Sequence, residues 1–125
     1  MCIIHDLGEC FTGDIPTFDK TLANSETEEI LLKKWVDTLP LSTSQKMSEL
    51  YIEMEEMEST EAKIYKAFDS LEALIQHNLS DLSTWSENEK TFNLTYADER
   101  VVFSRFLSEL REEIRKDTIL KLTKS

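Results

Sequence analysis

Four polar side chains near the amino terminus have the types and spacing that could bind a metal ion and move a proton. His5, Asp6 and Glu9 fall within about one helical turn, so all three can line one edge of a helix. Asp14 follows within a Gly- and Pro-containing turn, residues 12–16, that would point another carboxylate at the same place. Imidazole and carboxylate ligands together suit Mn, Fe, Co or Mg better than a structural zinc ion. A His-Asp pair alone is weak evidence, because such pairs are mostly solvated surface features.

These residues need a rigid segment to position them, and residues 1–10 are expected to form a helix with Ile3, Ile4, Leu7 and Cys10 on its apolar face. No Ser, Thr, Asp or Asn caps its start, so backbone donors in an apolar first turn would lack partners. We therefore expect that residues are missing upstream relative to a complete ancestor. Cys2 and Cys10 are interpreted as buried free thiols in a reducing cytoplasm.

Two amphipathic helices are expected next. Ser25 with Glu28 forms a capping box ahead of a helix that Leu39-Pro40 ends. Ser42 with Gln45 opens a second helix that runs to about Met57. Its methionines recur at three- and four-residue spacing, which favours core packing.

Two more strong helices are expected towards the carboxyl end. The segment Ser59-Thr60-Glu61 starts a helix that runs to about His77, and the last helix runs from about Asp98 to Lys116. Its buried face would carry six apolar residues, Val102, Phe103, Phe106, Leu107, Leu110 and Ile114. Residues 79–96 show no firm period and are expected to be irregular, with short helical turns.

Composition bounds the fold and the partners. A chain of 125 residues is one domain's worth of polypeptide, and its 40% hydrophobic residues with only two Gly and two Pro favour an all-α fold. A net charge of −11 repels a polynucleotide backbone, so the expected partner is a small phosphorylated molecule held by a cation or a few local basic residues. No apolar run approaches the ~20 residues of a membrane span, and a cytoplasmic location with no membrane partner is expected.

Two segments carry a family resemblance. The run from His5 to Pro16, HDLGECFTGDIP, resembles the signature of the HD-domain metal-dependent phosphohydrolases, in the branch that contains the 5'-deoxynucleotidases. The run from Glu61 to Asn78, EAKIYKAFDSLEALIQHN, is similar to the family's distal helix, and the order and separation of the two segments also fit. The resemblance covers most of the chain and implies one HD-type helical bundle over residues 1–125, truncated at the amino terminus.

The resemblance also implies roles for matching positions. His5 and Asp6 would be paired metal ligands and Asp69 the distal ligand, while Glu9 and Asp14 would be the catalytic carboxylates. The implied cofactor is a divalent ion, Mn, Co, Fe or Mg, and the implied substrates are (deoxy)nucleoside 5'-monophosphates or related phosphate esters. Lys20 and Lys66 are candidate phosphate contacts, although solvated surface lysines are at least as common. Glu72, one turn from Asp69, is a candidate supporting or substitute ligand. His77 is about 12 Å along a helix from Asp69, so we expect a packed or surface histidine.

The family also has an earlier metal-binding His on a preceding helix, for which the 125 residues contain no counterpart. Three explanations fit: a shortened chain, a partial gene product without activity, or a site completed by another chain. One hypothesis is a phosphomonoesterase or its fragment, and the alternative is a non-catalytic remnant that acts only in self-association. Hydrolysis of pyrophosphate linkages is a third. The family often dimerises, and a homodimer is therefore one expected arrangement.

Overall fold

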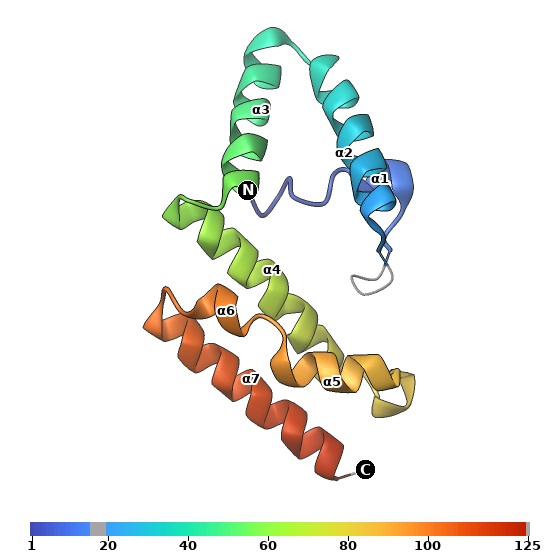
Figure 1. The fold of residues 1–125 in the computed structure, drawn as a ribbon, viewed down its shortest axis with the longest axis vertical. Coiled ribbons are helices and arrows are strands. Elements are labelled where there is room, and N and C mark those ends of the chain that lie inside the picture. The colour runs from blue at the N-terminus through green and yellow to red at the C-terminus, as the bar shows by residue number, and fades with distance from the viewer. Residues whose placement is uncertain (16–19, 125) are drawn as a thin grey trace. The chain divides into compact units, whose positions relative to one another are not determined.

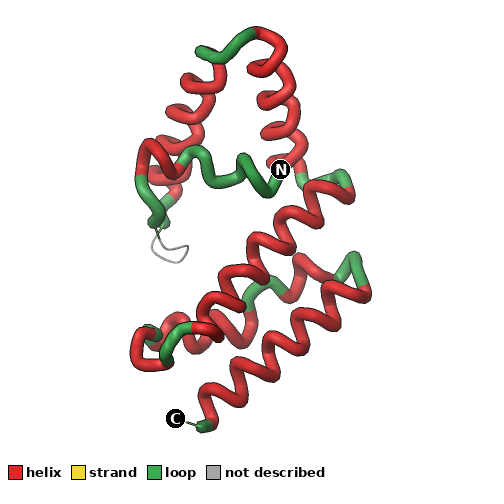
Figure 2. Tube along the Cα trace, turned by 180° about the vertical axis from the view of Figure 1, so that it is seen from behind, coloured by secondary structure: helices red, strands yellow, loops and turns green. Residues whose placement is uncertain are grey.

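The computed structural model describes residues 1–15 and 20–124, and the regular secondary structure in these ranges is helical, as the all-α prediction requires. Figure 2 shows helices joined by loops and no strand in these two ranges. The chain divides into two compact units, Met1–Ala62 and Lys63–Ser125, and each is described by itself.

The first unit is built on two long helices joined by a short turn, α2 (Leu22–Asp37) and α3 (Leu41–Glu56) (Figure 1). A short helix, α1 (Glu9–Thr12), lies against α2. Thr21 caps α2: its hydroxyl accepts a hydrogen bond from the backbone N–H of Asn24, whose side chain accepts one from the N–H of Thr21. This reciprocal pair satisfies donors that the first turn would otherwise leave open.

The starts of both helices were predicted wrongly, although the predicted end of the first is confirmed. Helix α2 begins about one turn before Ser25, because Thr21 rather than Ser25 provides the cap. Helix α3 begins at Leu41, directly after Pro40, and it has no side-chain cap, so the predicted Ser42 cap is wrong. Proline suits this place, because its ring fixes φ close to a helical value and it lacks the N–H that would need a partner.

Residues 1–10 do not form the predicted helix. Residues 2–8 are a succession of turns, in which the N–H of Ile4 bonds to the carbonyl of Met1 at 3.1 Å and that of Leu7 to Ile4 at 3.3 Å. Bonds of this kind span three residues instead of the four of an α-helix. Figure 2 draws this stretch as loop up to α1. Cys2 and Cys10 are exposed, so the prediction of buried thiols is also wrong.

Helix α4 (Thr60–Leu79) begins where the sequence predicted and ends two residues later than expected. Ser59 caps it, since its hydroxyl accepts the N–H of Ala62 at 3.1 Å. Beyond α4, a 3-10 turn, η1 (Leu82–Thr84), leads to α5 (Glu87–Thr95). The stretch predicted to be irregular therefore contains a nine-residue helix.

The predicted helix from Asp98 to Lys116 is two helices. Helix α6 (Asp98–Val101) stops after one turn, and α7 (Arg105–Thr123) starts afresh and continues beyond Lys116. The hydroxyl of Ser104 caps α7 by accepting the N–H of Leu107 at 3.3 Å. The break changes which side chains are covered: Val102 is 75% exposed and Phe106 is 69% exposed, contrary to prediction.

The core of the second unit lies among α4, α6 and α7, which run beside one another in Figure 1. It contains both small and large apolar side chains, namely Ala67, Leu71, Leu74, Ala97, Val101, Leu107 and Ile114. Ala97 is fully buried and has a left-handed backbone conformation with φ of 71°, which lets the chain turn from α5 into α6.

Asn93 connects three helices inside this unit. Its amide Nδ2 donates to the carbonyl of Leu74 on α4 at 3.3 Å and to Thr118 Oγ1 on α7 at 2.9 Å. Its backbone carbonyl accepts a hydrogen bond from the buried guanidinium of Arg111 at 3.0 Å. Arg111 Nε also lies 3.3 Å from Asp98 Oδ1. These bonds offset part of the cost of burying the polar groups, although Arg111 Nε and Nη1 make no hydrogen bond with the described residues.

No helix among the described residues is long and apolar enough to cross a membrane.

Candidate functional site

His5 and Asp6 place two potential metal ligands next to each other. The imidazole Nε2 lies 3.0 Å from Asp6 Oδ2. Two ligand atoms that each sit roughly 2.1 Å from one ion, at right angles, are separated by roughly 3.0 Å, so this spacing fits a shared cation. The other ring nitrogen, Nδ1, is 2.6 Å from the carbonyl of Cys2. Because a carbonyl only accepts, that contact favours a proton on Nδ1, as in metal-bound histidines, and leaves Nε2 as the ring nitrogen that faces Asp6.

The turns around His5 are held by α3. The hydroxyl of Tyr51 donates to the carbonyl of Ile4 at 2.8 Å, directly before His5. Burial raises the pKa of Tyr51, which keeps its hydroxyl protonated and able to donate. Nothing in the spacing of residues along this helix indicated the bond.

Glu9 lies in a negatively charged environment. Its pKa is raised to about 7, first by desolvation and then by the charges of Asp6, Asp14 and Glu28, while Lys20 lowers it. A carboxyl group with a pKa near neutrality can both accept and release a proton at neutral pH, as general acid-base catalysis requires. The structure thus brings Asp6, Asp14 and Lys20 into electrostatic range of Glu9.

Asp14 and Lys20 lie on either side of residues 16–19, which are outside the described residues, as is the end of the predicted turn over residues 12–16. Asp14 is exposed. Lys20 is not the solvated lysine that composition alone would favour, since its Nζ lies 2.6 Å from Glu28 Oε2 and its side chain is only 26% exposed.

Asp69 and Lys66 belong to the second unit, where both lie on α4. Lys66 Nζ is 3.4 Å from Asp69 Oδ2, a normal i,i+3 ion pair on one helix face. Glu72, the candidate supporting or substitute ligand, is exposed on the same helix. The grouping of Asp69 with His5 and Asp6 stays a prediction.

His77 is a packed histidine, as predicted. Its Nδ1 lies 2.8 Å from Asn93 Oδ1, and its ring tilts against Trp85 with 5.6 Å between centroids. Nε2 is 3.7 Å from Glu89. These contacts occupy both ring nitrogens within the second unit.

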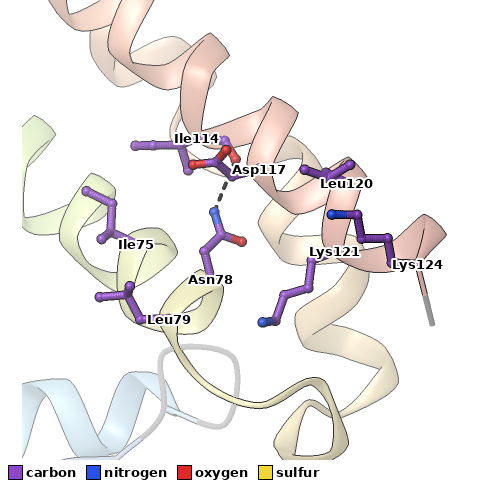
Figure 3. Close-up of a pocket in the computed structure, with 8 residues that line it drawn as sticks. All are labelled: Ile75, Asn78, Leu79, Ile114, Asp117, Leu120, Lys121 and Lys124. Carbon is purple, nitrogen blue, oxygen red and sulfur yellow. Dashed lines mark hydrogen bonds between the residues drawn. The ribbon is translucent and has the colours of Figure 1, made fainter.

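A shallow groove lies within the second unit, between the carboxyl ends of α4 and α7 (Figure 3). Its volume is about 320 Å³. Asn78 projects into it and donates to the carbonyl of Ile114 at 3.1 Å, and Lys121 and Lys124 stand at its rim. None of the predicted site residues lines it, so it is a different surface from the candidate site.

Glu28 is the residue that sequence reasoning misassigned. It was interpreted as half of a capping box, whereas its carboxylate pairs with Lys20 and lies against Gly8. No local signal indicates a bond between residues eight positions apart, across the start of a helix. Two oppositely charged residues near a helix amino terminus occur too often by chance to predict it.

Most of the chain is similar in sequence to known proteins. The HD domain family model matches residues 1–111. A 5'-deoxynucleotidase of Bos taurus is 32% identical over 78 residues, which are 61% of this chain and 38% of that protein. A 5'-deoxynucleotidase of Homo sapiens has the same identity over the same shares. The Dictyostelium discoideum protein of that name is 30% identical over 78 residues, 61% of this chain and 41% of its own.

The matched stretch thus spans only about two-fifths of these relatives' length. No solved structure is significantly similar to the chain.

Proposed function

The chain belongs to the HD domain family, and from that premise we propose that it is a metal-dependent phosphohydrolase that releases phosphate from (deoxy)nucleoside 5'-monophosphates. The observation that carries the proposal is the His5–Asp6 pair, with its 3.0 Å spacing and its anchored imidazole. The relatives named 5'-deoxynucleotidases support the choice of substrate class.

His5 and Asp6 would hold the metal ion together with Asp69. Nitrogen and carboxylate oxygen donors suit Mn, Co, Fe or Mg. Such an ion, when bound, neutralises phosphate charge and lowers the pKa of a water molecule. The remaining steps fall to the protein: the carbonyl of Cys2 keeps the imidazole oriented, and Tyr51 keeps the segment before it in place.

Glu9 and Asp14 are proposed as the catalytic carboxylates. One orients or deprotonates the attacking water, and the other gives a proton to the leaving oxygen. The pKa of Glu9, raised to about 7, makes this residue suitable for either task at neutral pH. Asp14 is exposed and could meet a substrate that approaches from solvent.

Lys20 and Lys66 are proposed to contact the substrate phosphate. A chain with a net charge of −11 needs local cations to attract an anionic substrate. Both lysines lie next to proposed site residues, Lys20 in electrostatic range of Glu9 and Lys66 beside Asp69. The proposal also retains one HD-type domain over residues 1–125 and a homodimer.

Metal analysis and phosphate release test this function. The purified chain, loaded with Mn or Co, should retain metal and release phosphate from deoxynucleoside 5'-monophosphates. His5→Ala should lower both by more than roughly 100-fold, because losing merely a hydrogen-bond partner of a metal ligand costs roughly 10–100-fold. Asp69→Asn should behave likewise if Asp69 is a ligand.

Asp6→Asn and Asp37→Asn form the matched pair for this test. Asp37 is exposed at the end of α2 and should be replaceable without loss. If the wild type retains no metal and releases no phosphate, or if His5→Ala releases as much as wild type, the proposal is wrong. The alternative of a non-catalytic chain that only self-associates would then be favoured, and sedimentation would test it.

A further inference from the structure

Lys20 and Glu28 form a partly buried ion pair in the first unit. The ammonium Nζ lies 2.6 Å from Oε2, and the side chains are 26% and 15% exposed. Most surface ion pairs contribute little, because solvent screens them and two long side chains lose freedom. This pair is more shielded, and it joins Lys20, which precedes the Thr21 cap of α2, to the second turn of that helix.

Glu28 also packs directly on the segment that carries the site. A Cβ added at Gly8 would lie 2.6 Å from Glu28 Cγ and 2.9 Å from Oε1, so the glutamate stem fills the space above this glycine. Gly8 is buried beneath it. The carboxylate is therefore fixed beside the backbone that leads from Asp6 to Glu9.

Lys20 is a cation in an otherwise negatively charged environment around Glu9. Among the described residues, four charged groups act on Glu9: three are carboxylates, and Lys20 is the cation. A phosphate that approached Glu9 would meet repulsion from Asp6, Asp14 and Glu28 unless the ammonium stayed nearby. A lysine on a free four-carbon stem would spend much of its time elsewhere.

We propose that Glu28 is a positioning residue that holds the ammonium of Lys20 beside Glu9, where it binds the phosphate of the substrate. The inference rests on the proposed function for its substrate class. An ammonium has three N–H donors, and the bond to Glu28 uses one, so two remain for phosphate oxygens. Glu28 itself touches no reacting atom.

The entropy that Lys20 has already lost in the ion pair determines how much Glu28 contributes to phosphate affinity. Ordering a free lysine side chain costs up to roughly tenfold in affinity, which the ion pair removes in advance of binding. Glu28→Gln should therefore weaken phosphate binding by roughly tenfold, although the substitution removes a negative charge and would otherwise favour an anion. The sign of the effect thus separates positioning from simple electrostatics.

A double-mutant cycle tests the proposal on the whole chain. The dissociation constant of inorganic phosphate is measured calorimetrically with magnesium present, for wild type, Glu28→Gln, Lys20→Met and the double variant. Glu29→Gln is the control, since Glu29 is the exposed neighbour on the same helix. Thermal unfolding of each variant is recorded, and KM and kcat for a deoxynucleoside 5'-monophosphate are determined.

Glu28→Gln and Lys20→Met should each weaken phosphate binding and raise KM more than they lower kcat, and the double variant should be no weaker than Lys20→Met. Glu29→Gln should match wild type. A purely structural pair would lower the unfolding temperature and leave phosphate binding unchanged, which would overturn the proposal. Losses that multiply in the double variant, tighter binding by Glu28→Gln, or a wild type that binds no phosphate would also overturn it.

The same data separate this proposal from the proposed function. A wild type that binds phosphate with the coupled losses but hydrolyses no ester would contradict the function and leave the positioning role intact. A wild type that hydrolyses the ester without coupling between positions 20 and 28 would support the function and contradict the positioning role.

Discussion

Glu9 should make the stability of the metal-free chain depend on pH. Its pKa is raised from 4.5 to about 7 in the folded state, so the folded chain holds this proton more tightly than the unfolded chain. The associated stability is complete below pH 4.5 and is lost as the pH rises through about 7. Solvent screening limits the change to on the order of 1 kcal/mol.

Urea unfolding between pH 4.5 and 8, with a chelator present, measures this effect. Glu9→Gln should remove the decline and be more stable than wild type at pH 8, whereas Glu29→Gln should keep the decline. A decline of equal size in Glu9→Gln would show that another group causes it. The chelator matters because a nearby divalent cation favours the ionised carboxylate.

Single residues show where sequence reasoning was sufficient. The sequence was enough to point to His5 and Asp6 as a pair, and their side chains do meet, even though the predicted helix is a set of turns. The turns keep these residues close because each bond spans only three positions. The Lys20–Glu28 pair and the Tyr51 hydroxyl bond could not be predicted, since both depend on how α2 and α3 pack.

At the level of helices, α5 depends on its cap. Ser86 accepts the N–H of Glu89 at 3.2 Å, and the Glu89 side chain accepts the N–H of Ser86 at 2.5 Å. Ser86→Ala should therefore cost about 1 kcal/mol of unfolding free energy. Ser42→Ala is the control, because Ser42 lies exposed inside α3 and caps nothing.

Chemical denaturation checks both variants. Ser42→Ala should change stability by less than about 0.5 kcal/mol, since alanine suits a helix interior and the site is exposed. Equal losses in the two serine variants would contradict the capping assignment.

Capping signals in the sequence predicted one helix start correctly and two others wrongly. Ser59 predicted the start of α4 correctly, while Ser25 and Ser42 lay inside helices that begin earlier. Serine is acceptable within a helix, so a Ser-x-x-Glu pattern does not by itself exclude one more turn upstream. The break between α6 and α7 was missed because apolar residues continue across it at helical spacing while Ser104 restarts the helix.

Asn93 should be the costliest polar residue to remove from the second unit. Asn93→Ala would leave the His77 ring, the Asn78 amide oxygen and the Thr118 hydroxyl each short of a partner. The expected loss is about 2–4 kcal/mol of unfolding free energy. Asn88→Ala is matched, since Asn88 lies exposed on the same helix and should change stability by less than about 0.5 kcal/mol.

Urea unfolding, monitored by circular dichroism, distinguishes the two asparagine variants. A loss below about 1 kcal/mol for Asn93→Ala would indicate that water or rearrangement replaces its bonds.

Considered as a whole molecule, the chain has an uneven distribution of buried side chains. The apolar core cluster lies in the second unit, whereas Val36 and Met54 are the buried large apolar residues described within α2 and α3. Regions with few buried contacts open more often and exchange their amide protons sooner. Amides of α4 and α7 should therefore exchange more slowly than those of α2 and α3, as hydrogen-exchange mass spectrometry would measure. Equal protection throughout would contradict this expectation.

The all-α class followed from composition and periodicity, and the family from two short segments. What could not be predicted is the division into two compact units and the polar network around Asn93. Both arise from contacts between residues distant in sequence, which neither propensity nor period records.

Ala97 limits which sequences can keep this fold. Its φ of 71° costs a residue with a side chain roughly 1–2 kcal/mol, and its full burial leaves no room for the asparagine that often tolerates this conformation. Glycine satisfies both demands, and alanine meets them at a tolerable energy. If position 97 were randomised and the library selected for folding, only alanine and glycine should be recovered there. The absence of every other amino acid at this position would therefore help to identify a distant homologue.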